Sequence, residues 1–212
     1  MFIQASTESI DVSPEWPRAD LALLEEIAHY PVALMGDALK RMGMMASAIH
    51  HVAGKASFYG TILPVLTREG DNLAIHLALD NAQPGDVLVI NANGEINRAV
   101  FGDLLGEVCL AKHVAAVVID GAVRDVEELG TMGLPTYARA VNPAGPSKYG
   151  PGSIGAPVAC GNVVCNPGDA IFGDRDGIIV IARHLVPSLA AKLKAQDTVE
   201  NTFRERVRAS VL

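Results

Sequence analysis

Three charged side chains near the middle of the chain could do chemistry together. Asp103 lies in the run GDLL, and Arg124 and Asp125 stand side by side after twenty intervening residues. A guanidinium can bind both oxygens of a carboxylate. An aspartate supplies the hard oxygen ligand that Mg²⁺ or Mn²⁺ prefers, with water completing the coordination. The set therefore predicts a site that binds an organic anion beside a divalent metal ion.

The elements around these residues should bring them to one place. Residues 87–91 and 114–120 read as consecutive apolar strands, and helices begin at about 103 and 125. If the strands are parallel neighbours, the loops that leave them open at the same edge of the sheet, where α/β proteins bind ligands. The free N–H groups at the start of the helix 103–113 suit a carboxylate or an oxyanion. We expect one site that is split along the sequence.

A structural role alone could also explain both aspartates. Asp103 precedes a helical turn and is of a type favoured at the N-cap. Asp125 and Glu128 match a capping box, in which one carboxylate caps the helix and a Glu three residues later reaches back. Capping and ligand binding are compatible, because both place a carboxylate at a helix start. The sequence leaves both interpretations open.

Two of these motifs also carry a family resemblance. GDLL followed by VVIDGAVRD resembles the class II pyruvate aldolases that cleave 4-hydroxy-4-methyl-2-oxoglutarate and 4-carboxy-4-hydroxy-2-oxoadipate. The same superfamily contains the regulator of ribonuclease E activity A. The resemblance runs from GDALKRMG at 36–43 through QPGDVLVI to NPGDAIFGDRDGIIVI, so it covers most of the chain.

The resemblance implies roles for individual residues. Backbone amides hold pyruvate at the four positions of the GDLL run, which here are Gly102, Asp103, Leu104 and Leu105. Arg124 would contact the oxygens of the substrate and act in catalysis, and Asp125 would bind the metal. Asp103 would orient a metal-bound water.

A glutamate on the C-terminal helix also contributes in these aldolases. Glu200 is the best match, and Glu205 is the alternative, because the run DTVENTFRER aligns loosely.

The activity implied is a divalent-metal-dependent retro-aldol cleavage. A 4-hydroxy-2-oxo dicarboxylic or tricarboxylic acid gives pyruvate and a second 2-oxo acid, with Mg²⁺ or Mn²⁺ as cofactor. Loss of CO₂ from oxaloacetate forms the same pyruvate enolate, so oxaloacetate decarboxylation is an expected second activity. The resemblance also implies trimers or pairs of trimers with active sites at subunit interfaces.

Two other functions stay open. One is a non-catalytic module that binds a protein partner, as the ribonuclease E regulators do; that branch lacks the acidic residue after the Arg, whereas Arg124 is followed here by Asp125. The other is an aldolase or decarboxylase for a different 2-oxo acid.

The expected fold is a layered α/β sandwich of the α-β-β-α type with mixed sheets, RraA-like and of the swivelling β/β/α kind. Residues 1–17 lack periodicity and read as an N-terminal arm, and 18–212 read as a single domain. The middle of the chain alternates strand and helix, which is typical of parallel βαβ units. Closely spaced short strands with NPGD and GDRDG turns indicate hairpins in the last third. A long helix is expected over about 184–208.

Composition excludes several partners. A formal charge of −7 over 212 residues argues against binding to nucleic acid or anionic membranes, which requires clustered basic residues. No apolar run reaches the roughly 18 residues of a membrane helix. Three cysteines without a CxxC pair indicate reduced thiols, mostly in the core, and a cytoplasmic location. They are Cys109, Cys160 and Cys165.

The remaining candidates have ordinary explanations. His76 lies among leucines at helical spacing and is expected to be packed or hydrogen-bonded, and His50 and His51 are expected in a loop. Lys55 and Lys148 could suggest Schiff-base chemistry, but the metal route explains more residues. Three basic residues near the C-terminus are expected on a solvated helix face, at Arg204, Arg206 and Arg208.

Overall fold

The computed structural model describes residues 6–210. Its helices are α1 (Leu21–Ile27), α2 (Val32–Ala38), α3 (Leu73–Asn81), α4 (Asp103–Ala111), α5 (Val126–Met132), a 3₁₀ turn (Arg183–Leu185) and α6 (Val186–Ser210). Its strands are β1 (Ile10–Val12), β2 (His50–Ala53), β3 (Phe58–Thr67), β4 (Asp86–Asn91), β5 (Ala99–Phe101), β6 (Ala116–Val123), β7 (Thr136–Val141), β8 (Gly152–Ile154), β9 (Val158–Cys160), β10 (Val163–Cys165), β11 (Ala170–Asp174) and β12 (Gly177–Ile181).

One large mixed sheet organises the chain. Its main order is β1-β8-β3-β4-β6-β7-β2, and β3, β4, β6 and β7 run parallel to one another. The predicted parallel pairing of the strands around 87–91 and 114–120 is confirmed. The hairpins β9–β10 and β11–β12 are antiparallel, with GDRDG as the turn of the second, as predicted. The mixed α/β fold is therefore the one expected from the sequence.

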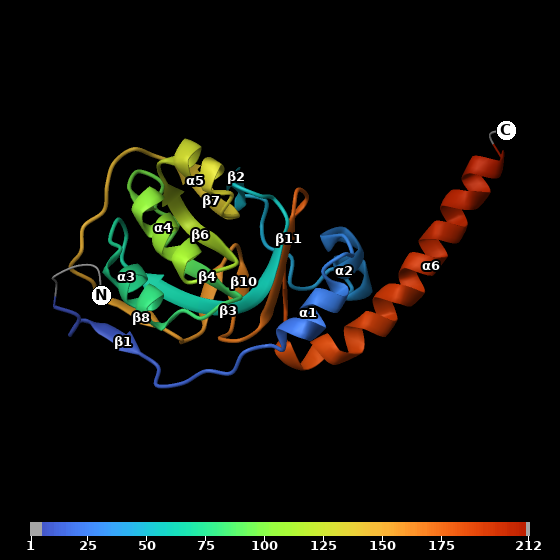
Figure 1. Cartoon of the computed structure of the whole chain (residues 1–212), viewed down its shortest axis with the longest axis horizontal. Coiled ribbons are helices and arrows are strands. Elements are labelled where there is room, and N and C mark those ends of the chain that lie inside the picture. The colour runs from blue at the N-terminus through green and yellow to red at the C-terminus, as the bar shows by residue number, and fades with distance from the viewer. Residues whose placement is uncertain (1–5, 211–212) are drawn as a thin grey trace.

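The central strands bury both of their faces. In β4, Leu88 and Ile90 join a core under α3, α4 and α5, whereas Val87 and Val89 face the core formed with the two hairpins. Side chains alternate across a strand, so a strand buried on both faces must be apolar throughout. Burying one such side chain contributes roughly 1.5–3 kcal/mol. Helices, large sheet and hairpins thus form successive layers (Figure 1).

A third core attaches the outer helices. Val186, Leu189 and Leu193 at the start of α6 are buried with apolar residues of α1, α2 and the β11–β12 hairpin. Beyond this base, α6 projects away from the body of the molecule (Figure 1), and residues 201–210 are all exposed. The long C-terminal helix was predicted, but its projection was not. No helix within residues 6–210 combines the length and apolar character needed to cross a membrane.

Two strands contain residues that are unusual or unexpected there. Pro64 lies in β3, a central strand, although proline in sheets is usually found on edge strands or at bulges. Its ring is tolerated because Pro64 lies between the segments of β3 that pair with β11 and with β8, where its carbonyl accepts from the Gly155 N–H at 3.0 Å. His50 and His51, expected in a loop, lie in β2, which pairs with β7.

The N-terminal segment and the cysteines also find places in the fold. Residues 10–12 of the predicted arm form β1, which pairs in parallel with β8; residues 1–5 lie outside the described part. The three cysteines are buried and unpaired, as predicted, and burial raises the pKa of Cys165 to about 12.

One buried carboxylate anchors the loop between β7 and β8. Asp71 accepts hydrogen bonds from the backbone N–H groups of Leu73, Tyr149 and Gly150 and from the Ser147 hydroxyl. Burial alone would raise the pKa of Asp71, but these donors outweigh it and hold the pKa below the usual value. The loop is therefore fixed to the start of α3.

Replacing Asp71 by Ala should destabilise the protein, because several buried donors lose their acceptor. We expect a loss in the free energy of unfolding on the order of 3 kcal/mol at pH 7. A lowered folded-state pKa contributes stability above the unfolded pKa of about 3.9, and this contribution is lost as the pH falls through the folded pKa. Urea denaturation should show the gap between wild type and variant narrowing below about pH 4. The exposed Asp11→Ala variant, as control, should show little change at either pH.

Candidate active site

A short strand that the sequence analysis missed assembles the candidate site. β5 pairs in parallel with the end of β6, with Ala99 opposite Ala122 and Phe101 opposite Val123. The Arg124 N–H extends this pairing by donating a hydrogen bond to the Phe101 carbonyl, with an N–O distance of 3.0 Å. The chain therefore leaves β5 and β6 at adjacent points, and the GDLL run begins beside Arg124. The two halves of the predicted site do come together.

Asp125 links those halves through its side chain. Its Oδ2 atom accepts from the Asp103 N–H at 3.3 Å and from Arg124 Nε at 3.2 Å. The predicted capping box is wrong: Asp125 occupies the N-cap position of α5 but makes no side-chain capping bond there. Its backbone has a left-handed conformation, φ 56°, which turns the carboxylate toward α4. The uncommon backbone conformation of Asp125 thus lets its carboxylate accept a hydrogen bond at the start of α4.

The start of α4 already holds carboxylate oxygens. Gly102, not Asp103 as predicted, is the N-cap; Asp103 is the first helical residue, and its Oδ1 accepts from the Leu104 N–H at 2.7 Å. The Asp103 N–H donates to the Asp125 carboxylate, so the first two amides of α4, those of Asp103 and Leu104, both donate to carboxylate oxygens of the chain itself. The Leu105 N–H has no acceptor within the described residues. These contacts show that this helix start can bind a carboxylate.

Gly102 is required because of this close approach. A Cβ atom added there would collide with Asp125 Oδ2 and would lie 3.0 Å from the Arg124 Cγ. The position has an extended backbone that any residue adopts, so space alone selects glycine.

The guanidinium of Arg124 keeps most of its donors available. Its Nε is used on Asp125, but neither Nη atom has a hydrogen-bond partner among residues 6–210. A Cβ atom on Gly145 would lie 2.9 Å from Nη1, so the loop between β7 and β8 passes directly over the guanidinium. The side chain is about one third exposed. It can therefore offer two N–H groups to a bound anion.

Arg124 and residues 102–105 line a cavity of about 370 Å³, a volume suited to a small organic ligand. Its walls come from the start of α4, from Arg124, from the start of α3 and from the loop between β7 and β8. The side chains that give it polar character are Asn72, His76, Asp103, Arg124 and Lys148.

The donor set fits a divalent cation of the Mg²⁺ type. Asp103 Oδ2 and Asp125 Oδ1 accept no hydrogen bond from the described residues, and the two residues are joined by the bond from the Asp103 backbone N–H to Asp125 Oδ2. No group of three His, Cys, Asp or Glu residues within residues 6–210 could hold a metal alone. Mg²⁺ needs only one or two carboxylates when waters and a substrate complete its octahedron, so two suffice.

The predicted glutamates lie elsewhere. Glu200 is on the projecting part of α6, where its Oε2 accepts from Arg204 Nη2 at 2.7 Å. Glu205 is exposed on the same helix. Neither lines the cavity of its own chain, so the structure does not bring them to Asp103, Arg124 and Asp125.

His76 is at the site although no role was predicted for it. It lies on α3, it is half-buried, and its Nδ1 is buried without a hydrogen-bond partner. Burial, reinforced by the charge of Lys148, lowers the pKa of His76. Asn72 also reaches the cavity. Helical spacing among leucines gave no signal for either residue, because only the fold places the start of α3 beside α4.

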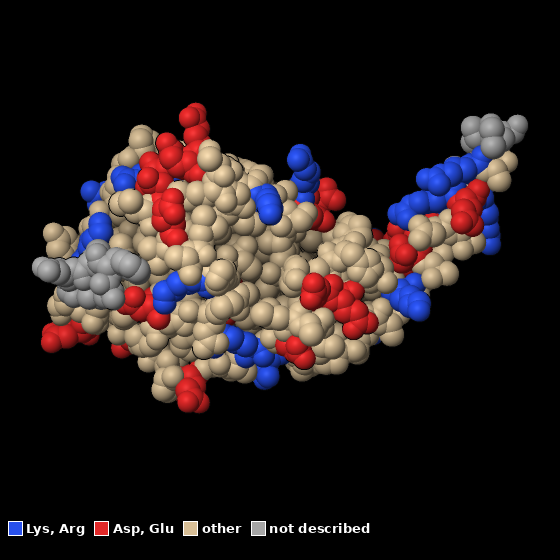
Figure 2. Space-filling view, viewed as in Figure 1, with Lys and Arg blue, Asp and Glu red and all other residues tan. Residues whose placement is uncertain are grey.

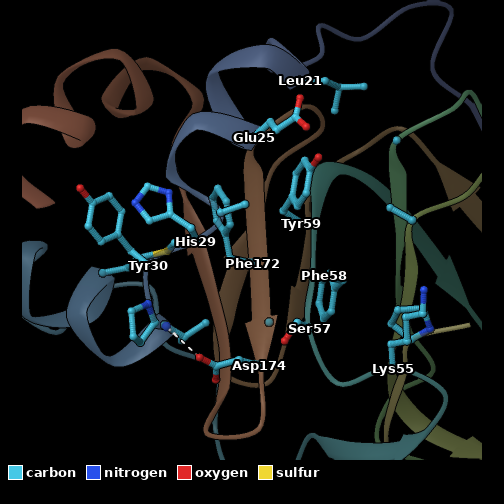
Figure 3. Close-up of a pocket in the computed structure, with 18 of the residues that line it drawn as sticks. Leu21, Glu25, His29, Tyr30, Lys55, Ser57, Phe58, Tyr59, Phe172 and Asp174 are labelled. Atoms are coloured by element: carbon cyan, nitrogen blue, oxygen red, sulfur yellow. Dashed lines mark hydrogen bonds between the residues drawn. The ribbon is translucent and has the colours of Figure 1, made fainter. Parts of the chain in front are cut away.

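A larger cavity of about 920 Å³ lies at the opposite edge of the sheet. Figure 3 shows it between α1, α2 and the β3–β11 strands, with Phe58, Tyr59 and Phe172 around it. It reaches Gly85 and Ala115, just before β4 and β6 begin. Ligands of parallel sheets bind at the carboxyl ends of the strands. The smaller cavity is therefore the candidate active site.

Known proteins resemble the chain in sequence and in fold. The RraA-like family model, described as Aldolase/RraA, matches residues 32–180. A provisionally named 4-hydroxy-4-methyl-2-oxoglutarate aldolase of Halalkalibacterium halodurans is 32% identical over 189 residues, covering 89% of this chain and 90% of the relative. One of Pseudomonas aeruginosa PAO1 with the same name is 30% identical over 153 residues, covering 72% and 94%.

A solved structure resembles it over a similar length. Streptomyces coelicolor RraAS2, described as an unusual member of the RNase ES inhibitor RraA family, superposes with a TM-score of 0.79 at 25% identity. The match covers 89% of this chain and all of that one.

Replacing Gly102 by Ala should disrupt the site without unfolding the protein. The added methyl group displaces the Asp125 carboxylate and shifts Arg124, and a displacement of about 1 Å at reacting groups lowers turnover roughly 100-fold. Turnover of 4-hydroxy-4-methyl-2-oxoglutarate, the compound in the names of the two relatives, and the melting temperature measure the two effects. Gly130→Ala in α5 is the matched control, because a Cβ atom there meets nothing within 4 Å. Equal turnover in the two variants would show that Gly102 does not position the site.

Proposed function

Because the chain belongs to the RraA-like family, Aldolase/RraA, we propose that it is a metal-dependent pyruvate aldolase. The substrate is a 4-hydroxy-2-oxo dicarboxylic or tricarboxylic acid, of which 4-hydroxy-4-methyl-2-oxoglutarate and 4-carboxy-4-hydroxy-2-oxoadipate are the two expected members. The products are pyruvate and a second 2-oxo acid. The observation that carries the proposal is that Asp103 and Arg124 line one cavity and that the Asp125 carboxylate bonds to both of them.

The helix start and Arg124 bind the pyruvate half of the substrate. The N–H groups of residues 103–105 take the C1 carboxylate, and those of Asp103 and Leu104 already take carboxylate oxygens in the free protein. The unused Nη groups of Arg124 donate to the C2 carbonyl oxygen. Both contacts are made before bond cleavage, so they orient the C3–C4 bond for the reaction.

Cleavage then requires one proton and one electron pair to move. A water hydrogen-bonded to the Asp103 carboxylate takes the proton of the C4 hydroxyl and passes a proton on to that carboxylate, which can later return it to C3. C4 becomes a carbonyl as the C3–C4 bond breaks. The bonding electrons pass to the C2 oxygen, which gives the pyruvate enolate, and Arg124 stabilises the charge on that oxygen. Protonation at C3 then releases pyruvate.

A divalent cation fits beside these residues. Asp125 would hold it and Asp103 would orient its water, and it would supply Lewis-acid stabilisation of the developing negative charge. Mg²⁺ and Mn²⁺ both suit the oxygen donors.

The same residues support decarboxylation of oxaloacetate. Loss of its C4 carboxylate as CO₂ leaves the same enolate on the C2 oxygen, so the stabilisation by Arg124 applies unchanged. An aldolase or decarboxylase acting on another 2-oxo acid would also use these groups.

A regulatory protein without catalysis is the other candidate class. The likeness to RraAS2 favours this class. The carboxylate of Asp125 beside Arg124 supports catalysis instead, because binding a protein partner does not require a carboxylate at this position.

The projecting helix points to a shared site between copies of the chain. Val199 and Phe203 are 69% and 66% exposed on α6, an apolar face that a monomer leaves in water. Basic side chains gather on this part of α6, and acidic side chains gather over the α5 end of the body (Figure 2). We propose a trimer or hexamer in which α6 of one copy brings Glu200 to the cavity of the next. Glu200 would then help to orient the water that takes the C4 hydroxyl proton.

Charge removal at the site tests the catalytic proposal. Arg124→Ala and Asp125→Ala, in metal-replete buffer, should each slow pyruvate release by a barrier increase of about 3 kcal/mol or more, because stabilisation of the enolate is lost. A coupled pyruvate assay with several 2-oxo acids, with and without a chelator, measures this. Parental rates in the Asp125 variant, or no turnover of any substrate by the wild type, would refute the aldolase assignment.

Mixing two inactive variants tests the shared site. Asp125→Ala and Glu200→Ala should each be nearly inactive alone, since each lacks one carboxylate of every site. After unfolding and refolding together in equal amounts, about one site in four joins an intact Asp125 to an intact Glu200 from another copy. Pyruvate release should recover to a comparable fraction. If the mixture stays as inactive as its components, Glu200 does not act across the interface.

A further inference from the structure

One wall of the candidate active site carries polar side chains that the mechanism above does not use. Asn72, His76 and Lys148 line the same cavity as Asp103 and Arg124, from the start of α3 and the loop between β7 and β8. None of these three residues belongs to the GDLL run or to the Arg-Asp pair.

Two of these side chains are buried with unsatisfied atoms. The Asn72 residue is 5% exposed, and its Oδ1 has no hydrogen-bond partner. The Nδ1 atom of His76, one helical turn further along α3, is also buried without a hydrogen-bond partner. Buried polar groups are almost always hydrogen-bonded, because an unpaired one costs about 1–3 kcal/mol. Both residues line the cavity, where the Asn72 Nδ2 group and an N–H of the His76 ring can donate hydrogen bonds to a ligand.

The third side chain is held beside them by the fold. The Asn72 N–H donates to the Ser147 carbonyl at 3.0 Å, and the Asp71 carboxylate binds the N–H groups of Tyr149 and Gly150. Lys148 lies between these anchored residues, so its backbone is fixed against the start of α3. Lys148 and His76 line the same cavity, and the charge of Lys148 helps to lower the pKa of His76.

We propose that Asn72, His76 and Lys148 bind the second carboxylate of the substrate, the one on the far side of the cleaved bond from C1. This inference rests on the proposed function, which assigns the C1 carboxylate to residues 103–105 and the C2 oxygen to Arg124. The ammonium group supplies charge, and the imidazole and the amide each supply a hydrogen bond. The subsite selects a 2-oxo acid with two or more carboxylates over its monocarboxylic counterpart.

The chemistry of the wall favours a carboxylate over an apolar group. A methyl or alkyl end would leave the Asn72 amide and the His76 nitrogen unsatisfied and would desolvate Lys148. The exposure of Lys148 at the mouth of the cavity lets its ammonium meet a charged ligand end without being buried beforehand. A charge-assisted hydrogen bond to a carboxylate is about twice as strong as a neutral one, so Lys148 should contribute most.

Binding of two uncleaved probes tests the subsite. 2-Oxoglutarate has carboxylates at both ends, whereas 2-oxopentanoate has the same chain length and ends in a methyl group. In metal-replete buffer, calorimetry should show that Lys148→Met weakens 2-oxoglutarate binding about tenfold or more relative to 2-oxopentanoate binding. His76→Leu should change the same ratio in the same direction, and Lys148→Arg should restore most of it.

Lys55→Met is the matched control, because Lys55 is exposed and lies at the other cavity. It should leave the ratio of the two affinities at the wild-type value. Lys148 is itself exposed, so its substitution should not prevent folding, and the melting temperature checks this for both variants. An equal change for the two probes in Lys148→Met, or no change for either, overturns the proposal.

A kinetic comparison separates this inference from the proposed function. With 4-hydroxy-4-methyl-2-oxoglutarate and the monocarboxylic 4-hydroxy-2-oxopentanoate, Lys148→Met should lower kcat/KM at least tenfold more for the first, whereas Arg124→Ala should lower both. If the wild type cleaves neither acid, the aldolase proposal fails while the affinity ratio still decides the subsite. If the wild type cleaves both and Lys148→Met affects them equally, the subsite fails and the aldolase proposal stands.

Discussion

The Oδ2 atom of Asp125 lies within hydrogen-bonding distance of the Asp103 N–H and of Arg124 Nε, and the candidate site depends on this double contact. It joins the end of β6 to the start of α4 across the short ladder between β5 and β6. The left-handed backbone of Asp125 turns the carboxylate toward that point, and the missing side chain of Gly102 leaves room for it. The backbone conformation of Asp125, the glycine at position 102 and the pairing of β5 with β6 therefore all position the same carboxylate.

Much of this arrangement could be predicted from residue patterns, for physical reasons that differ between elements. The apolar strands 87–91 and 114–120 had to be buried on both faces, so parallel pairing and a common loop edge followed. β5 was missed because three residues carry no periodicity. The wall formed by Asn72, His76 and Lys148 was missed because it depends on long-range contacts made by Asp71, which no local pattern encodes. Glu200 was predicted by resemblance alone, and its helix leaves the body of its own chain.

The helix starts show how a capping pattern can mislead. Both aspartates have residue types and neighbours that favour N-caps. In the structure, the Asp103 carboxylate bonds the next amide and the Asp125 carboxylate bonds a different helix. Both carboxylates satisfy the preference of the α4 N-terminus for negative charge, Asp103 from within the helix and Asp125 from outside it. The same preference stabilises ordinary helices, but here the helix start lines a cavity.

The amides at the start of α4 are occupied in the free protein by the carboxylates of Asp103 and Asp125. An incoming anion must therefore exchange with the chain's own oxygens, and each oxygen that it displaces becomes available to a cation. For the proposed substrate and metal ion, thermodynamic linkage would then make each strengthen the binding of the other by the same factor. Such a site would fill as a pair, so the concentration of one proposed ligand would set the effective affinity for the other.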